Sequence, residues 1–236
     1  MSEVREIAES KTVLVLRTCN ADLSSHNGFN WRESGVVEAP DWNARPECGG
    51  GLHGLLWGEG EGDLLNWDAD AKWLVCAVKE SSIVDIGGKI KFPRCEVVHC
   101  GDRLSATSYL ASNGGAGRAI VGGTATAGNY GTATAGDGGT ATAGDDGTAT
   151  AGYGGTATAG NYGTIVIKRW DGNRYRVMVG YIGENGLLPN VAYRLDEQGR
   201  FVLAQPSIPD AGPHVSESQD GNTADSQTEV NDETKN

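Results

Sequence analysis

The pattern of apolar and polar positions divides the chain into an irregular first half, a strictly repeating middle and a β-rich end. In the first half, short apolar runs alternate with loops rich in glycine and tryptophan. The clearest runs are four to eight residues long, which is typical of strands. Strands are predicted at 11–17, 73–79, 82–86 and 90–92, and a short helix is predicted at 104–111.

Residues 124–163 are five octapeptides, each with Thr-Ala-Thr-Ala-Gly, two variable positions and a final Gly. Thr favours strands, and Gly, Asn and Asp permit tight corners, so each unit predicts a four-residue strand and a corner. The corners alternate. Asn-Tyr-Gly or Asp-Asp-Gly ends units one, three and five, and Asp-Gly-Gly or Tyr-Gly-Gly ends units two and four. A stacked array is therefore predicted, a short β-solenoid whose 16-residue coils have two strands and two unlike corners.

Side-chain alternation along a strand predicts which residues of the repeat point inward. Downstream, Ile165 and Ile167 occupy the alanine positions. Upstream, Ala119 and Val121 occupy the same positions, and Arg118 stands at a threonine position. We therefore predict that the alanines face a narrow core and the threonines face outward.

After the array, two hairpins are predicted. Asp-Gly at 171–172 separates the runs 165–170 and 174–179, which is a strong hairpin pattern. A second hairpin is predicted around 196–199. The predicted fold class is mainly β, in four parts: an N-terminal α+β domain (1–115), a two-sided β-solenoid (116–167), a β-hairpin cap (168–204) and a disordered acidic tail (205–236).

Charge is concentrated in that tail. Residues 205–236 carry seven acids and one base, which is half of the net charge of −12. A polar segment with excess charge is typical of disorder. Because the remainder is also mildly acidic, direct binding to nucleic acid is not expected.

Five cysteines at irregular spacing are a poor basis for disulfides. The first ten residues have no apolar core of a signal peptide, and no run approaches the ~20 apolar residues of a membrane span. These features predict a cytoplasmic protein with reduced thiols (in the host cytosol if a phage encodes it) and no membrane partner.

The segment 150–160, Thr-Ala-Gly-Tyr-Gly-Gly-Thr-Ala-Thr-Ala-Gly, resembles the 16-residue repeats of bacterial ice-nucleation proteins. In that family the outward Thr-x-Thr rows are taken as the ice-ordering surface, and tyrosine ladders as an edge for self-association. The tyrosines here do not form one continuous ladder. The resemblance implies these candidate binding residues: Thr124, Thr126, Thr140, Thr142, Thr156, Thr158, Tyr130, Tyr153 and Tyr162.

Residues 50–53 before a Leu- and Trp-rich run, and the cap with Trp170-Asp-Gly-Asn, also resemble segments that flank degenerate β-helical repeats in phage and prophage proteins. That resemblance implies a mobile-element setting. The leading hypothesis is a non-enzymatic interaction module that inhibits or modulates a host defence system by binding a host protein or complex. The solenoid would be its scaffold, and open strand edges would allow a homodimer. The basic residues Lys168, Arg169, Arg174 and Arg176 of the first hairpin are candidates for an acidic partner.

Two other functions stay open. One is an ice- or surface-binding structural protein that uses the outward Thr-x-Thr rows. The other is an NAD-using enzyme related to ADP-ribosyltransferases in the N-terminal domain. The residues considered for that enzyme are Arg17, His53, Glu59, Glu61 and Asp63.

Other patterns in the sequence are weaker. Cys95, His99 and Cys100, with Cys48 and His53, offer zinc ligands at unsuitable spacing. The glycine loops at 49–51 and 58–62 lack the strand and helix context of a phosphate-binding loop. The acidic tail, together with Asp137, Asp145 and Asp146 at the corners, suggests mimicry of nucleic acid. We assign no catalytic residue and expect no metal and no cofactor.

Overall fold

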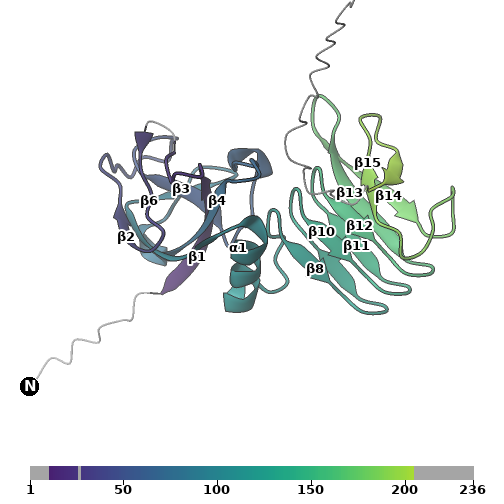
Figure 1. Cartoon of the computed structure of the whole chain (residues 1–236). Helices are drawn as coiled ribbons and strands as arrows, with labels where there is room; N and C mark the ends of the chain where they lie inside the picture. Colours follow the sequence, from purple (N-terminus) through teal and green to yellow (C-terminus); the bar gives the residue numbers. More distant parts are fainter. Residues whose placement is uncertain (1–10, 26–27, 205–236) are drawn as a thin grey trace, which may run out of the picture. The chain divides into compact units, whose positions relative to one another are not determined.

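The computed structural model describes residues 11–25 and 28–204 of the 236-residue chain. The predicted acidic tail, 205–236, lies outside the described residues. The described part is mainly β with one short α-helix, as the sequence predicts (Figure 1). Its strands form one seven-stranded sheet near the N-terminus and two sheets that build the solenoid and its hairpins.

The N-terminal sheet is antiparallel throughout, in the order β2-β7-β4-β1-β3-β6-β5. Strands were expected in four of its segments, at 11–17, 73–79, 82–86 and 90–92. The short β2 and β3 lie in glycine-containing stretches without a clear apolar alternation. The strands are β1 (Thr12–Cys19), β2 (Gly35–Glu38), β3 (Leu52–Leu56), β4 (Lys72–Lys79), β5 (Val84–Asp85), β6 (Ile90–Phe92) and β7 (Arg94–Gly101).

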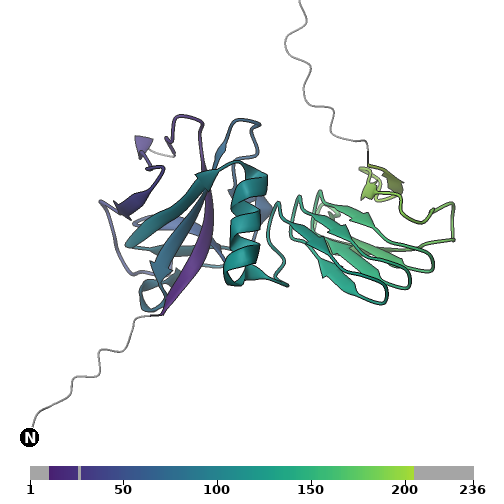
Figure 2. The same ribbon diagram turned by 60° about the horizontal axis from the view of Figure 1, so that its bottom comes forward.

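Large apolar side chains are buried on both faces of this sheet. One cluster contains Val15, Cys76 and Phe92, and the other contains Leu16 and Trp73. The helix α1 (Arg103–Leu110) packs on the second cluster and lies along the sheet in Figure 2. Shorter helical turns complete this part: η2 (Gly62–Leu64), η3 (Glu80–Ser82) and η4 (Ala111–Gly115).

The solenoid coils have the predicted 16-residue period. Thr140 pairs in parallel with Thr124 and Thr156, and Thr148 pairs with Thr132 and Thr164. Most strands have three residues rather than four, because the second alanine already belongs to the corner. The two sheets contain β8 (Thr124–Thr126), β10 (Thr140–Thr142) and β12 (Thr156–Thr158), and β9 (Thr132–Thr134), β11 (Thr148–Ala151) and β13 (Thr164–Trp170).

The alanines fill the space between the two sheets, and the threonines point outward, as predicted. Ala141, Ala149 and Ala157 are fully buried, and Ile165 and Ile167 continue the same core at the C-terminal end. This core is narrow because no side chain larger than a methyl group enters it along the repeats.

The upstream extension of the array is present only as a corner, and the strand predicted there is absent. The Gly136 N–H donates to the Ile120 carbonyl at 3.0 Å, and Gly122 has positive φ like Gly138. Residues 118–121 form no strand, and the adjacent Ile120 and Val121 are both buried, whereas alternation would expose one of them. They pack in the cluster of Leu16 instead, and the Val121 N–H donates to the Gly58 carbonyl at 2.8 Å. A contact from a distant sheet therefore overrides the local pattern.

The two corners of each coil are built differently. At one corner Tyr130, Asp146 and Tyr162 have positive φ of 60°, 53° and 57°. The preceding side chains stack along the array. Asn129 Oδ1 accepts from the Asp145 N–H at 3.0 Å, and Asp145 Oδ1 accepts from the Asn161 N–H at 2.7 Å. The other corner uses glycine at the positive-φ position, Gly138 and Gly154.

Both predicted hairpins are present, and each extends one sheet of the solenoid. β14 (Tyr175–Tyr181) pairs antiparallel with β13. β15 (Tyr193–Leu195) pairs antiparallel with β12 and with β16 (Phe201–Leu203). At the C-terminal end of the array, each of the two parallel sheets is thus continued by antiparallel strands.

Candidate functional site

One sheet of the solenoid carries a regular array of threonines. Register places Thr124, Thr140 and Thr156 in one column, and their i+2 neighbours in a second. Strands lie about 4.8 Å apart and alternate residues about 6.7 Å apart, so the array is a nearly rectangular grid. The threonine face is defined as Thr124, Thr126, Thr140, Thr142, Thr156 and Thr158.

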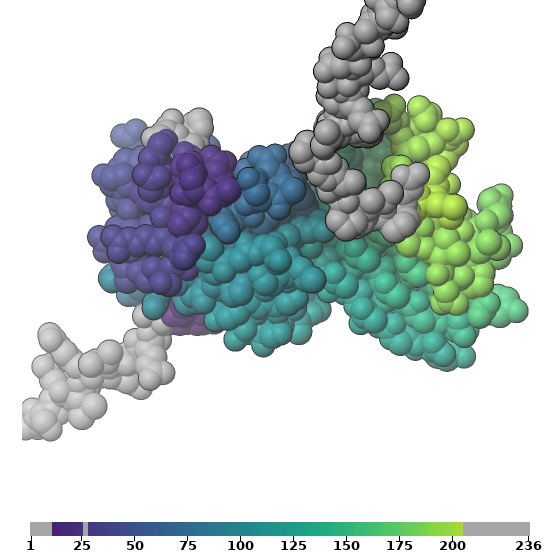
Figure 3. All heavy atoms as spheres, viewed as in Figure 1, coloured from purple at the N-terminus to yellow at the C-terminus, as the bar shows by residue number. Residues whose placement is uncertain are grey.

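The hydroxyl groups of the threonine face are free to meet solvent. Within residues 11–25 and 28–204, no hydrogen bond to another protein group is found for any of the six hydroxyls, and all six residues are exposed or half-buried. The face borders the exposed Arg194 on β15. In the space-filling view the side chains of the coils close the gaps seen between the ribbons (Figure 3).

The opposite sheet begins with the same threonine pattern and ends in an apolar strip, defined as Val166, Val177 and Val179. Val166 replaces the last threonine of its column and pairs with Val179, and Thr164 pairs with Tyr181. Val177 on β14 is 63% exposed. This strip is not among the candidates predicted from the sequence, although its alternation, with Tyr175 and Tyr181 at either end, is visible there.

The three candidate tyrosines occupy different corners. Tyr130 and Tyr162 lie on one corner with Asp146 between them and are 81% and 83% exposed. Tyr153 lies on the opposite corner, where its ring meets Tyr175 edge-on at 6.0 Å between centroids. They form no continuous ladder, as the sequence predicts.

The four basic residues of the first hairpin do not form one patch. Lys168 lies in an ion pair with Asp137 at 2.7 Å. Arg169 is directly opposite Arg176 across the hairpin, and its Nη2 donates to the Glu197 carbonyl at 2.6 Å. Since Lys168 and Arg169 are consecutive strand residues, they point to opposite faces.

Asp137 is the most connected corner residue. Its buried carboxylate accepts from the Tyr153 N–H at 2.8 Å and the Gly62 N–H at 3.4 Å, besides its ion pair with Lys168. Asp145 accepts from the next coil, so of the three acidic corner residues only Asp146 is exposed. The corners therefore offer no row of free carboxylates of the kind that mimicry of nucleic acid would need.

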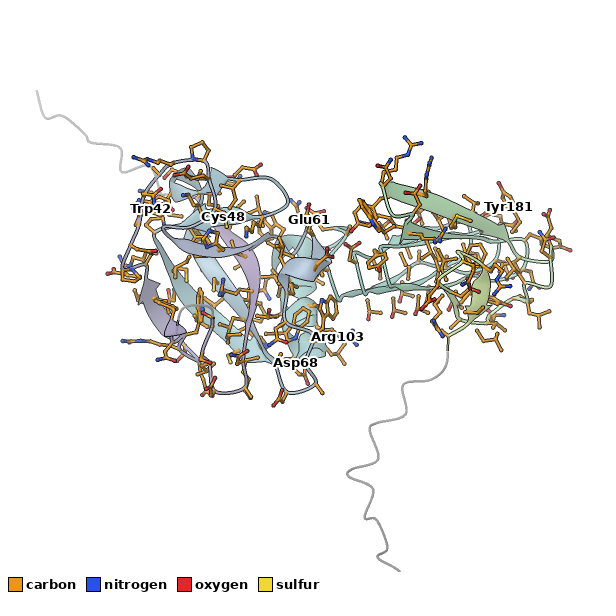
Figure 4. All side chains as sticks on the ribbon, turned by 90° about the horizontal axis from the view of Figure 1, so that it is seen from above. Trp42, Cys48, Glu61, Asp68, Arg103 and Tyr181 are labelled. Carbon is orange, nitrogen blue, oxygen red and sulfur yellow. The ribbon has the colours of Figure 1, made fainter. Side chains whose placement is uncertain are left out.

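The structure brings together only some of the residues that were candidates for an enzyme site. Arg17 and His53 line a cavity of about 750 Å³ in the N-terminal part, and Arg17 Nη1 donates to the His53 carbonyl at 2.9 Å. Glu59, Glu61 and Asp63 are not among the residues that line it. Figure 4 shows Glu61 well apart from Cys48, another lining residue.

The candidate zinc ligands are separated. Cys48 and His53 line the cavity, whereas Cys95 is buried in β7 and His99 Nε2 lies 3.1 Å from Ser105 Oγ. Over the described ranges, no group of three or more His, Cys, Asp or Glu is placed to hold a metal ion, and all five cysteines are unpaired. Hydrogen bonding with Cys95, together with burial, raises the pKa of the Cys76 thiol.

Together these features define a β-solenoid repeat protein with ice-nucleation-like repeats. Of the curated relatives, the ice nucleation protein of Pseudomonas syringae is 45% identical over 101 residues, which cover 42% of this chain and 9% of that protein. That of Pseudomonas fluorescens is 42% identical over 107 residues (44% and 9%). Ice nucleation protein InaU of Pantoea ananas is 41% identical over 100 residues (42% and 10%).

The chain thus spans about a tenth of the length of these curated relatives. No family model matches the chain, and no solved structure matches it significantly. The phage or prophage origin that the flanking segments suggested is not shown by these comparisons.

The prediction of a cytoplasmic location is wrong, because it conflicts with the likeness to ice nucleation proteins. It rested on unpaired thiols and on the composition of the first residues, and neither feature fixes a compartment. Separately, the described part of the chain contains no helix long and apolar enough to cross a membrane.

Proposed function

We propose that this chain is a structural protein that binds ice, or an ordered layer of water, through the threonine face. The observation that carries the proposal is the register of six outward threonines in two straight columns with free hydroxyls. The likeness to proteins named for ice nucleation supports it independently of that geometry.

The chemistry of threonine suits this role. Each side chain offers one hydroxyl, which both donates and accepts, and one methyl group, which does neither. Branching at Cβ restricts χ1, so the grid is already ordered before water arrives. The backbone ladders between the coils hold the columns at a fixed spacing. Water bound to such a grid loses less freedom on joining a lattice than water on an irregular surface.

The small size of the array limits the expected activity. Three strands contribute to the threonine face, and the curated relatives are about ten times longer than the matched region. We therefore expect adsorption to existing ice rather than efficient nucleation. The alternative role as an inhibitor of a host defence system gains no support from the comparisons.

The experiment compares the two sheets of the solenoid. Replacing Thr126, Thr142 and Thr158 by Leu should abolish both incorporation into a growing ice hemisphere and thermal hysteresis, because the hydroxyl column is lost. The matched control replaces Thr134 and Thr150 by Leu at the same strand position on the other sheet and should keep most of the activity. Circular dichroism checks that both variants fold.

Two outcomes would contradict the proposal. The first is a folded wild-type chain that ice excludes. The second is equal adsorption by wild type and the threonine-face variant. If the control variant alone lost activity, the apolar strip and its threonines would be the binding surface instead.

A further inference from the structure

The cavity in the N-terminal part has the size and lining of a small-molecule site. Its volume of about 750 Å³ lies within the ~300–1,000 Å³ usual for ligand pockets. The aromatic rings of Phe29 and Trp31 line it, and they contact each other edge-on at 5.5 Å between centroids. Backbone of the 49–51 glycine loop forms part of the wall, with positive φ at all three residues.

A half-buried arginine that has no carboxylate partner among the described residues lines this cavity. Arg17 lies on β1 and is half-buried, and the partial loss of solvation lowers its pKa. Its guanidinium stacks 4.5 Å from the Trp31 ring centroid, and Nη1 donates to the His53 carbonyl. Within residues 11–25 and 28–204, no ion pair includes Arg17, and its Nε has no hydrogen-bond partner.

An unpaired buried charge is costly for folding. A buried guanidinium normally meets a carboxylate, because the desolvation cost is otherwise uncompensated. The edge of the guanidinium that carries Nε is the one that binds a carboxylate or phosphate with two parallel hydrogen bonds. Arg17 can therefore bind an anion at its Nε, where the described residues supply none.

His53 adds a second unpaired polar atom at the same wall. Its Nε2 is buried and has no hydrogen-bond partner among the described residues. Burial lowers the pKa of His53, and the positive charges of Lys89, Arg17 and Lys91 lower it further. The imidazole is thus neutral near pH 7 and can donate to, or accept from, a ligand according to its tautomer.

The charge of the wall favours an anion as well. Lys89 lines the cavity. Among the described lining residues the only carboxylate is that of Asp41, which accepts from the Gly51 N–H at 3.2 Å. From these observations we infer that the cavity binds a small organic oxyanion. Its carboxylate or phosphate group pairs with the Nε edge of Arg17, and its flat apolar part lies against Phe29 and Trp31.

Isothermal titration of the full chain with benzoate, phenyl phosphate and benzamide tests this inference. At least one of the two anions should bind with a dissociation constant of about 10 mM or tighter. Benzamide, which has the same ring without the charge, should bind about tenfold more weakly or not at all. A preference between the two anions identifies the oxyanion as carboxylate or phosphate.

Three variants locate the site. Arg17→Lys keeps a positive charge but removes the Nε edge, and Arg17→Met removes both, so each should weaken anion binding by about tenfold or more. Arg94→Met is the matched control, since Arg94 is an exposed arginine paired with Glu38, and its affinity should not change. The inference is overturned if no anion binds, if benzamide binds equally well, or if Arg17→Met binds as wild type does.

A second measurement requires no ligand. If Arg17 is kept for binding, Arg17→Met removes a half-buried charge that no described carboxylate balances, and the melting temperature should stay equal or rise. A purely structural arginine would instead lower the melting temperature on replacement. A clear fall in the melting temperature of Arg17→Met, with anion binding unchanged in Arg17→Lys, would therefore also overturn the inference.

Discussion

The N-terminal sheet and the solenoid bury their cores in opposite ways. In the sheet, large side chains such as Leu16, Leu74 and Phe92 are fully enclosed on the two faces. In the solenoid, the enclosed side chains along the repeats are single methyl groups. The sheet therefore depends on side-chain packing, and the solenoid depends on hydrogen-bond ladders between successive coils.

This difference in core packing affects the kind of binding surface that each region can form. A core of large side chains is close-packed, and the cavity beside Arg17 lies where irregular segments around Phe29 and Gly50 border the sheet. A core of identical alanines imposes one coil geometry on every repeat, so the outward residues inherit a regular spacing. The first region is suited to enclosing a small ligand, and the second is suited to presenting a periodic face.

Leu74→Ala tests the sheet core and should have the largest effect. Leu74 is fully buried, so its truncation should lower the free energy of unfolding by about 2–5 kcal/mol. Chemical denaturation measures the change. The control Leu104→Ala, at an exposed position of α1, should change it by less than about 0.5 kcal/mol.

In the solenoid, Ala149→Gly removes only one buried methyl group and should lower the free energy of unfolding by about 1 kcal/mol. Equal costs for Leu74→Ala and Ala149→Gly would contradict the comparison.

Asp137→Ala tests a corner of the solenoid whose carboxylate combines an ion pair with hydrogen bonds to two other segments. The change removes the acceptor for two N–H groups and the ion-pair partner of Lys168. We expect a loss of about 3 kcal/mol in thermal or chemical unfolding. This is the low end for a buried pair, because the Lys168 side chain keeps 34% exposure.

The matched control is Asp145→Ala on the other corner. Asp145 makes the same type of bond to the next coil without a cation, so its loss should cost about 1 kcal/mol. If both variants lost the same amount, the ion pair and the contact with Gly62 would contribute nothing measurable.

Gly144→Ala tests the close stacking of coils. A Cβ at Gly144 would lie 2.2 Å from Asn129 Oδ1 and 2.6 Å from its backbone nitrogen, so the coils must shift apart. We expect a loss of about 1–3 kcal/mol on chemical denaturation. Gly128 occupies the same position one coil earlier, where a Cβ would meet no other atom within 4 Å, so Gly128→Ala should be neutral or slightly stabilising. A neutral Gly144→Ala would show that the ladders tolerate wider spacing.

Acidification should have the smallest effect, and two of the carboxylates that it affects lie at the hairpin tips. Hydrogen bonds from the Arg174 N–H, the Arg176 side chain and the Asn173 N–H lower the pKa of Asp171, and the Arg200 N–H lowers that of Asp196. Because both pKa values are below those of the unfolded chain, the stabilisation is present above about pH 4 and is lost as pH falls further. Amide exchange protection at 173–174 and 198–200 should decrease in that window. Asp171→Asn should remove the pH dependence at the first tip only, and a change at both tips would contradict this assignment.

Much of the solenoid could be predicted because its information is local and repeated. The corner alternation gives the 16-residue period, and Ile165 and Ile167 indicate the inward positions. The same local logic fails at 118–121, because Ile120 and Val121 pack against a sheet that begins about a hundred residues earlier. The periodicity of the repeat cannot predict that contact.

The sequence indicated candidate residues such as Arg17 and His53, but it could not show that they line one cavity. Arg17 and His53 are 36 positions apart, and the register that pairs Leu16 with Leu55 brings them together. Nothing in the sequence gives that register in advance. Asp137 shows the same limit: like Asp145 it follows Thr-Ala-Gly in the repeat, and its contacts with Lys168 and Gly62 do not follow from that position.

The attachment of one hairpin to each sheet restricts how the array can change in length. An added segment of 16 residues returns the chain to the same sheet and the same corner, so β14 and β15 would still meet their partners. An added segment of eight residues would exchange the sheets and present each hairpin with the wrong neighbour. Duplications and deletions that preserve both ends are therefore confined to whole coils, and the threonine face can grow only one complete row at a time.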